Sequence, residues 1–298
     1  MAPTLRSRTR IDSLPNEVLE KVFVNLDDAS KCKASRVCSK WRDVIYARRK
    51  NDVVCIRNIE KVRQCVSFFV RNHVQKYKLR YRNLSKLYTT TNVMSLDTCV
   101  KIVHLDLSGS TCLSNSAVKE TVAPLTALKW LSLDGCTGIG SQGLKDVLKN
   151  LVHLEYLSLK HSNITLGVLM AMPNANLQHL DLSYCQLLNG YEICYPSRFF
   201  LNLKTFIMDG VRAASEAPIV LAFKYLPRLE TVSARNCEFI MGIFVDPCPA
   251  GFKLLDIRGC GGDHEKDTTI FEKLNSRRDG SVVVRFTDKD GRDVTVRV

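Results

Sequence analysis

A short pattern of apolar and polar positions recurs seven times between residues 102 and 261. Each copy has the form LxxLxL, and its second apolar position is called the anchor below. The anchors are Leu105, Leu131, Leu157, Leu180, Phe206, Val232 and Leu255. Consecutive anchors are 26, 26, 23, 26, 26 and 23 residues apart. This regularity indicates a repeat protein, in which each copy is too small to bury its own apolar residues and neighbouring copies stack.

The alternation LxL has the period of a β-strand, so each copy predicts a short strand with its anchor pointing inward and its flanking residues outward. Helical patterns such as residues 141–151 and 215–226 return the chain between strands. Two weaker strands, near Val54 and Leu79, extend the array to nine repeats from about residue 53 to 260. We therefore predict an α/β fold, a curved solenoid preceded by a small helical segment.

The pattern resembles the leucine-rich-repeat family in its cysteine-containing subtype, where a cysteine stands five residues after the anchor. That place holds Cys136, Cys185, Cys237 and Cys260, and otherwise Ser110, Ser162 and Val211. The resemblance implies a leucine-rich-repeat horseshoe over residues 53–262, with these cysteines filling its core. Residues 263–298 then predict a cap, made of a helix over 267–275 and a β-hairpin that turns at Asp290-Gly291.

The segment LPNEVLEKVFVNL, residues 14–26, has an apolar residue every three to four positions. These residues are Val18, Leu19, Val22, Phe23 and Leu26. The pattern predicts an amphipathic helix, followed by two short helices over residues 29–36 and 39–50. Three helices of this size bury little, so the stripe either packs on the first repeats or meets another chain.

An ordered set of residues in this segment resembles the F-box motif. The set is Leu14-Pro15, Glu17, Val18-Leu19, Val22-Phe23, Leu26, Val37-Cys38 and Trp41-Arg42. An F-box over residues 11–50, after a basic tail at 1–10 and before a repeat array, is similar to the F-box/leucine-rich-repeat proteins. The resemblance implies that the F-box binds a Skp-type adaptor, and through it the cullin and RING subunits of an SCF-type ubiquitin ligase. The repeats would bind a client protein.

The adaptor contacts implied by the resemblance are Leu14, Pro15, Val18, Leu19, Val22, Phe23, Leu26, Val37, Cys38 and Trp41. One position departs from the family pattern: Lys31 stands where the second helix often has a leucine, with Cys32 as the apolar neighbour. This departure either weakens the adaptor interface or shifts the helix by one position.

Outward residues of the strands are the predicted client contacts on the concave face of the solenoid. They are His104, Asp106, Trp130, Asp134, Tyr156, Lys160, His179, Asp181, Arg235 and Arg258. Because adjacent strands lie about 4.8 Å apart, Trp130 and Tyr156 should be neighbours in one outward column. Outward aromatic residues are frequent interface anchors. The alternative is that the C-terminal hairpin or a neighbouring loop folds over them.

The net charge of +13 is concentrated near the beginning of the chain: residues 1–100 hold 21 basic and 9 acidic side chains, a net charge of +12. Residues 6–10, 48–50 and 76–82 supply much of this excess. They form either a solvated basic face or a docking surface for an acidic partner. Aromatic residues are only modestly interleaved with the basic ones and no nucleic-acid motif occurs, so nucleic acid is a disfavoured partner.

Catalytic, metal and cofactor motifs are absent from the sequence, so we expect no enzyme activity, metal or cofactor in this chain. Its twelve cysteines include no CxxC pair. No apolar run approaches the roughly 18 residues that cross a bilayer, and the first residues lack a secretory signal. We therefore expect no membrane partner and a reducing compartment, cytoplasmic or nuclear. The alternative function is a non-catalytic repeat scaffold that acts outside ubiquitination.

Overall fold

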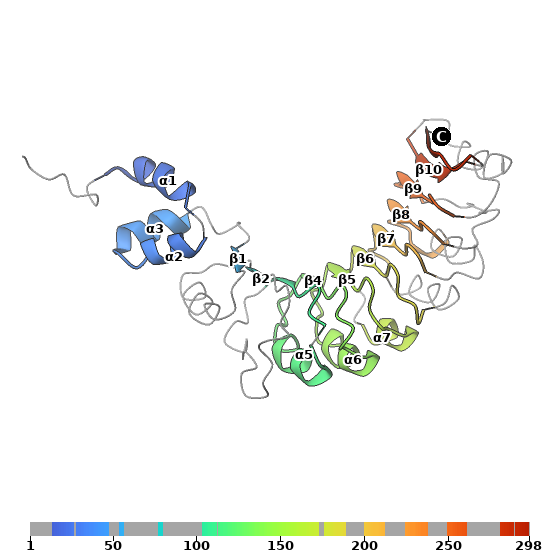
Figure 1. The fold of residues 1–298 in the computed structure, drawn as a ribbon, viewed down its shortest axis with the longest axis horizontal. Helices are drawn as coiled ribbons and strands as arrows, with labels where there is room; N and C mark the ends of the chain where they lie inside the picture. Colours follow the sequence, from blue (N-terminus) through green and yellow to red (C-terminus); the bar gives the residue numbers. More distant parts are fainter. Residues whose placement is uncertain are drawn as a thin grey trace, which may run out of the picture. The chain divides into compact units, whose positions relative to one another are not determined.

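The structure is a computed structural model, and it describes residues 14–26, 28–47, 54–56, 77–79, 103–111, 113–172, 176–188, 200–211, 224–237, 249–260, 281–288 and 290–297. The chain divides into two compact units, Met1–Leu79 and Arg80–Val298. Figure 1 shows the helices and strands of both units and labels most of them. The predicted helix at 267–275 and most of the predicted helix at 215–226 lie outside the described residues.

Three short helices make up the first part of the N-terminal unit: α1 (Asn16–Val24), α2 (Asp28–Ala34) and α3 (Ser39–Ala47). Pro15 precedes α1, and its carbonyl accepts the first helical hydrogen bonds, from the N–H groups of Val18 and Leu19 at 3.1 Å each. Proline suits this place because a helix leaves its first N–H groups without intrahelical partners. The three predicted helices are thus confirmed.

A small core holds these helices together. Leu19 and Phe23 of α1 are 0% and 4% exposed, and Val44 and Ile45 of α3 are also buried. The ring of Phe23 meets the indole of Trp41 edge-to-face, with 5.0 Å between ring centroids. This geometry is favourable for aromatic pairs beyond the area that they bury.

Two further strands of this unit, β1 (Val54–Ile56) and β2 (Tyr77–Leu79), pair in parallel. The sequence predicted strands at both places, but it aligned Val54 with Leu79. The observed register instead places Ile56 opposite Leu79. The apolar pattern of these two segments is too weak to fix the register, because it recurs in only two copies.

The second unit contains a nine-stranded sheet. Its first seven strands are β3 (His104–Asp106), β4 (Trp130–Ser132), β5 (Tyr156–Ser158), β6 (His179–Asp181), β7 (Thr205–Ile207), β8 (Thr231–Ser233) and β9 (Leu254–Asp256). They lie side by side in chain order and pair in parallel. All seven predicted anchors face one another in register, and each is at most 2% exposed. The predicted solenoid is confirmed over these strands.

Three helices, α5 (Asn115–Thr121), α6 (Ser141–Leu148) and α7 (Leu166–Met170), return the chain between the earlier strands. Figure 1 shows them together on one side of β4 to β6. The core lies between these helices and the sheet, and helical residues such as Val118, Leu144 and Val168 are buried there with the anchors. The outward strand residues lie on the opposite side of the sheet, since side chains alternate along a strand.

The cysteines of the repeat motif are buried, as predicted, and they also donate hydrogen bonds between repeats. The thiol of Cys185 reaches the carbonyl of Leu159 at 3.1 Å, and that of Cys260 reaches the carbonyl of Ala234 at 2.9 Å. The hydroxyl of Ser162 makes the equivalent contact with Leu133 at 3.3 Å. Serine can therefore replace cysteine at this place, since both side chains donate to the preceding repeat.

Each of the strands β3 to β9 is followed by a turn whose residue four places after the anchor has a positive φ. Four repeats have glycine there and the other three have His161, Tyr184 and Asn236, with φ between 54° and 57°. The left-handed region is unfavourable for residues with a side chain. The rings of His161 and Tyr184 stack at 4.7 Å on adjacent repeats, a contact that accompanies this conformation.

A hairpin of β10 (Val283–Thr287) and β11 (Asp293–Arg297) completes the sheet. Strand β10 pairs in parallel with β9, so the hairpin covers the edge of the last repeat. The connecting turn contains Asp290 and Gly291, and Gly291 has a φ of 77°. The predicted hairpin and the place of its turn are confirmed.

Candidate protein-interaction surfaces

Exposed apolar side chains lie on the helices of the N-terminal unit. Val18, Val22, Val24 and Val37 are 42%, 47%, 69% and 59% exposed. Pro15 is also exposed, whereas Leu14, Leu26, Cys38 and Trp41 are half-buried. Several exposed apolar residues on so small a unit are typical of a surface that another protein covers.

Two predicted adaptor contacts, Leu19 and Phe23, belong instead to the core of this unit. The apolar stripe that the sequence predicts on α1 is wide, so it includes both a buried face and an exposed edge. Val18 and Leu19 are consecutive on a helix, so their side chains point about 100° apart and only one of them faces the core. Leu19 and Phe23 therefore orient α1, and Val18 and Val22 supply its surface. Val24, at the end of α1, lies off the stripe and was missed for that reason.

Lys31, which departs from the F-box pattern, has a local role in the structure. Its ammonium donates to the carbonyl of Val24 at 3.3 Å, at the C-terminal end of α1. Lys40 makes a similar contact, of 2.7 Å, with the carbonyl of Leu14 at the other end. Lysine near a helix C-terminus satisfies carbonyls that have no intrahelical donor. Lys31 thus links α2 to α1.

A stack of four rings runs across the outward side of β3 to β6. His104, Trp130, Tyr156 and His179 are direct partners on successive strands. Their ring centroids are 3.8, 4.5 and 4.1 Å apart, and their planes differ by 4°, 13° and 8°. We call these residues the aromatic ladder. The predicted pairing of Trp130 with Tyr156 is confirmed. These two rings connect the two histidines, whose strands are separated by two others.

Stacking determines which parts of the rings a partner protein can contact. The faces of the two central rings are covered by their neighbours, so these rings present their edges and polar tips. Burial raises the pKa of Tyr156 to about 12, helped by the carboxylates of Asp134 and Asp181. Burial lowers the pKa of His179 to about 4, partly opposed by Asp134. Both rings are therefore uncharged at neutral pH.

A row of five aspartates runs beside the ladder, and we call it the carboxylate row: Asp106, Asp134, Asp181, Asp209 and Asp256. Each lies one or three residues after an anchor, where the side chain faces outward. Hydroxyl groups connect the row: Ser108 donates to Asp106 at 2.6 Å, Ser158 to Asp134, and Ser233 to Asp209 at 2.6 Å. Asp106 is only 5% exposed, so it makes an internal contact with Ser108 instead of the predicted client contact.

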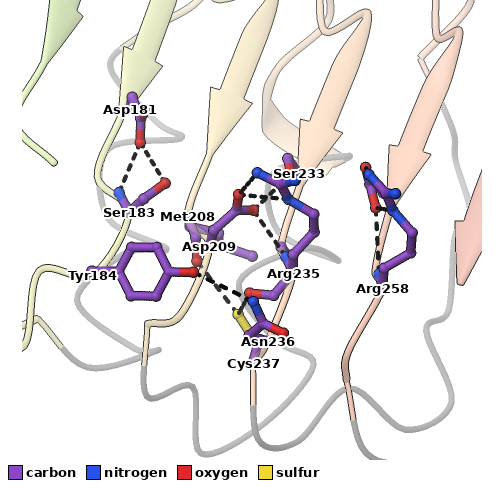
Figure 2. A network of polar contacts seen from close by, with 12 residues as sticks. Asp181, Ser183, Tyr184, Met208, Asp209, Ser233, Arg235, Asn236, Cys237 and Arg258 are labelled. Carbon is purple, nitrogen blue, oxygen red and sulfur yellow. Dashed lines mark hydrogen bonds and ion pairs between the residues drawn. The ribbon is translucent and has the colours of Figure 1, made fainter. Parts of the chain in front are cut away.

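Two arginines neutralise the C-terminal part of the row, as Figure 2 shows. Arg235 donates from Nε and Nη2 to Asp209 at 2.8 and 2.6 Å, and Arg258 donates to both oxygens of Asp256 at 2.9 and 2.7 Å. Burial opposes ionisation of Asp256, but the hydrogen bonds from Arg258 outweigh it and lower its pKa. The alternation of the strands predicts both arginines and both aspartates on this face, but it does not predict that they pair.

The described residues contain neither a candidate metal site nor a helix that could cross a membrane. In the part of the chain that the structure describes, no three His, Cys, Asp or Glu side chains gather in a way that could hold a metal ion. No helix in the same part of the chain has the length and apolar character to cross a membrane. The basic segments at residues 6–10 and 48–50 lie outside the described residues.

Comparison with protein-family models identifies both parts of the chain. An F-box-like domain matches residues 11–49, and a leucine-rich repeat matches residues 176–196. The first match contains α1, α2 and α3, and the second contains β6. The chain thus has an F-box-like domain followed by a leucine-rich-repeat solenoid. Both are modules that typically serve protein interaction.

Comparison with curated proteins gives no significant match. Among solved structures, a chain of the yeast Rad7–Elc1 complex matches with a TM-score of 0.49 and 13% identity, over 80% of this chain and 64% of that one. A chain of the TLR13–ssRNA13 complex matches with a TM-score of 0.47 and 15% identity, over 74% of this chain and 35% of that one. Resemblances this distant carry no argument about function.

Proposed function

We propose that this chain is the substrate-recognition subunit of an SCF-type ubiquitin ligase. The F-box-like helices would bind a Skp-type adaptor, which links the chain to cullin and RING subunits. The solenoid would bind a client protein through the outward side of its strands. The observation that carries the proposal is the F-box-like match over residues 11–49, on helices that leave Val18, Val22 and Val37 exposed.

The contribution of such a subunit is proximity. Holding a client lysine near a charged conjugating enzyme raises the effective concentration of the two reacting groups, without any catalytic residue on the receptor itself. The cysteines of the repeat motif suit this role, because they are buried and a reactive thiol needs an accessible setting. Burial raises the pKa of Cys185 to about 12. These cysteines therefore serve the core.

The exposed edge of α1 provides the test. Replacing Val18 and Val22 together by lysine leaves the core residues Leu19 and Phe23 in place but puts two charges where the adaptor would bury valines. We expect the affinity for a purified Skp-type adaptor to fall by at least about 2 kcal/mol, or roughly thirtyfold. Isothermal titration calorimetry measures this change.

Val152→Lys is the matched control, because Val152 is 46% exposed but belongs to the solenoid. It should leave adaptor affinity unchanged. Tight adaptor binding by the Val18→Lys, Val22→Lys chain would show that the F-box-like surface lies elsewhere. A wild-type chain that folds but recovers neither adaptor nor cullin from cells would favour the alternative function, a scaffold outside ubiquitination.

A further inference from the structure

The carboxylate row is neutralised at Asp209 and Asp256 but not at Asp134 and Asp181. Asp209 and Asp256 each receive a guanidinium group from this chain, whereas Asp134 and Asp181 receive only hydroxyl and amide groups. Ser158 and the N–H of Lys160 donate to Asp134, and Ser183 donates to Asp181. No lysine or arginine of the described ranges pairs with either carboxylate. The two acids are half-buried, so they remain accessible from outside.

The neutralised and unneutralised aspartates occupy equivalent places in the repeats, and they differ only in the side chains around them. Asp134 with Lys160 occupies the same places in its repeats as Asp209 with Arg235. The backbone N–H of Lys160 donates to Asp134 at 3.1 Å, just as that of Arg235 donates to Asp209 at 2.9 Å. The cationic groups then diverge, because the Lys160 ammonium lies 5.5 Å from the ring centroid of Tyr184. Ser183 and Arg258 also occupy the same place in their repeats, so Asp181 has a serine beside it where Asp256 has an arginine.

Two like charges without a counterion make this place electrostatically unfavourable. Burial raises the pKa of Asp134, and the charge of Asp181 raises it further. A cation placed beside these carboxylates would relieve both effects. The adjacent aromatic ladder adds a rigid apolar edge, which loses little conformational freedom on binding because each ring is already held by its neighbours.

We propose that the ladder and the two unneutralised acids, Asp134 and Asp181, bind a basic segment of the client protein. An arginine or lysine of that segment would pair with these carboxylates, as Arg235 and Arg258 pair with theirs. The apolar part of its side chain would lie along the edges of Trp130 and Tyr156. This inference rests on the proposed function, because it names the chemistry of the client.

The test uses a fluorescein-labelled peptide of repeated Arg-Ser-Gly triplets, with the Glu-Ser-Gly peptide as its counterpart, and fluorescence anisotropy with the full chain. We expect the arginine peptide to bind and the glutamate peptide not to bind. Asp134→Asn together with Asp181→Asn should weaken binding by at least about tenfold. The matched control is Glu155→Gln with Glu230→Gln, which changes the net charge equally but alters carboxylates already paired with Lys129 and Lys253 at 2.7 and 2.6 Å.

A second variant tests the geometry without removing an acid. Ser183→Arg places a guanidinium group beside Asp181, in the arrangement that Arg258 has beside Asp256. Because Ser183 is 1% exposed, circular dichroism must first show that the variant folds. The folded variant should weaken peptide binding by about tenfold or more, because the counterion is then supplied within the chain.

Three results would overturn the proposal: equal losses in the asparagine and glutamine pairs, unchanged binding by Ser183→Arg, or no binding by the wild-type chain. A polyuridine oligonucleotide that binds more tightly than the peptide and is lost in the same variants would replace it with a nucleic-acid site. Adaptor titration of the same proteins separates the two hypotheses. Peptide binding without adaptor binding contradicts the ligase role alone, and the reverse contradicts this inference alone.

Discussion

His179 ends the aromatic ladder, with one ring face against Tyr156 and its Nε2 buried without a hydrogen-bond partner. Such a site accepts a neutral imidazole but penalises a charged one, which is why burial lowers the pKa of His179 to about 4 from its ordinary 6.5. The unfolded chain, where the ordinary value applies, therefore takes up this proton first as pH falls.

Stability should consequently depend on pH through this residue. The contribution of His179 is fully present above pH 6.5 and is lost as pH falls from there towards 4. Urea unfolding at several pH values measures the loss. His179→Phe keeps a ring in the ladder but removes the titration, so its free energy of unfolding should fall less steeply over this interval. His153→Gln, at an exposed histidine, should behave as wild type; an unchanged slope in His179→Phe would contradict the assignment.

At the scale of the repeat element, the turn after each strand from β3 to β9 requires one residue in the left-handed backbone conformation, even where that residue is not glycine. Gly135 and Gly210 both meet this requirement, with φ of 66° and 63°, but their surroundings differ. A Cβ on Gly135 would meet only backbone at 4.0 Å, whereas one on Gly210 would lie 2.3 Å from the ring of Tyr184.

These two glycines form a matched pair. Gly135→Ala should lower the free energy of unfolding by about 1 kcal/mol, the cost of a left-handed alanine. Gly210→Ala should cost at least about 1 kcal/mol more, because the Tyr184 ring must also move. Urea denaturation of both variants measures the difference. Equal losses would mean that the Tyr184 ring shifts freely, and that its stacking with His161 does not restrain it.

The elements most readily predicted from sequence were those repeated most often. Seven LxL patterns in one phase left a single consistent register, and the structure has it. The same argument failed for β1 and β2, where the pattern has only two weak copies. It also failed to separate the buried from the exposed residues of the α1 stripe. Periodicity identifies an apolar face but not how much of that face neighbouring helices cover. The pairing of Arg235 with Asp209 depends on side-chain conformations, which an alternating pattern does not encode.

At the scale of the whole molecule, two units with separate cores hold two separate candidate surfaces. The chain as a whole has a net charge of +13, yet the carboxylate row gives the ladder face several acids. A basic peptide is therefore attracted to this face by local charges and against the net charge of the protein. Net charge alone would have predicted an acidic partner for the entire chain.

Separate cores predict independent binding. Trp130→Ala with Tyr156→Ala should abolish binding of the arginine peptide and leave adaptor affinity within about twofold of wild type. Because this pair removes three ring contacts, we also expect it to destabilise the solenoid by about 2 kcal/mol, so binding must be measured well below its melting temperature. Conversely, the Val18→Lys, Val22→Lys chain should bind the peptide normally. Loss of both activities in either variant would contradict the independence of the two surfaces.

The chain has two tryptophans, and they are divided between its two units. Trp41 lies against Phe23 among the helices, and Trp130 lies between His104 and Tyr156 in the ladder. Replacing Trp41 by phenylalanine leaves a protein whose indole fluorescence comes from the ladder alone, and replacing Trp130 leaves one whose emission comes from the helices alone. The molecule thus contains a separate optical reporter beside each of the surfaces through which we expect it to act.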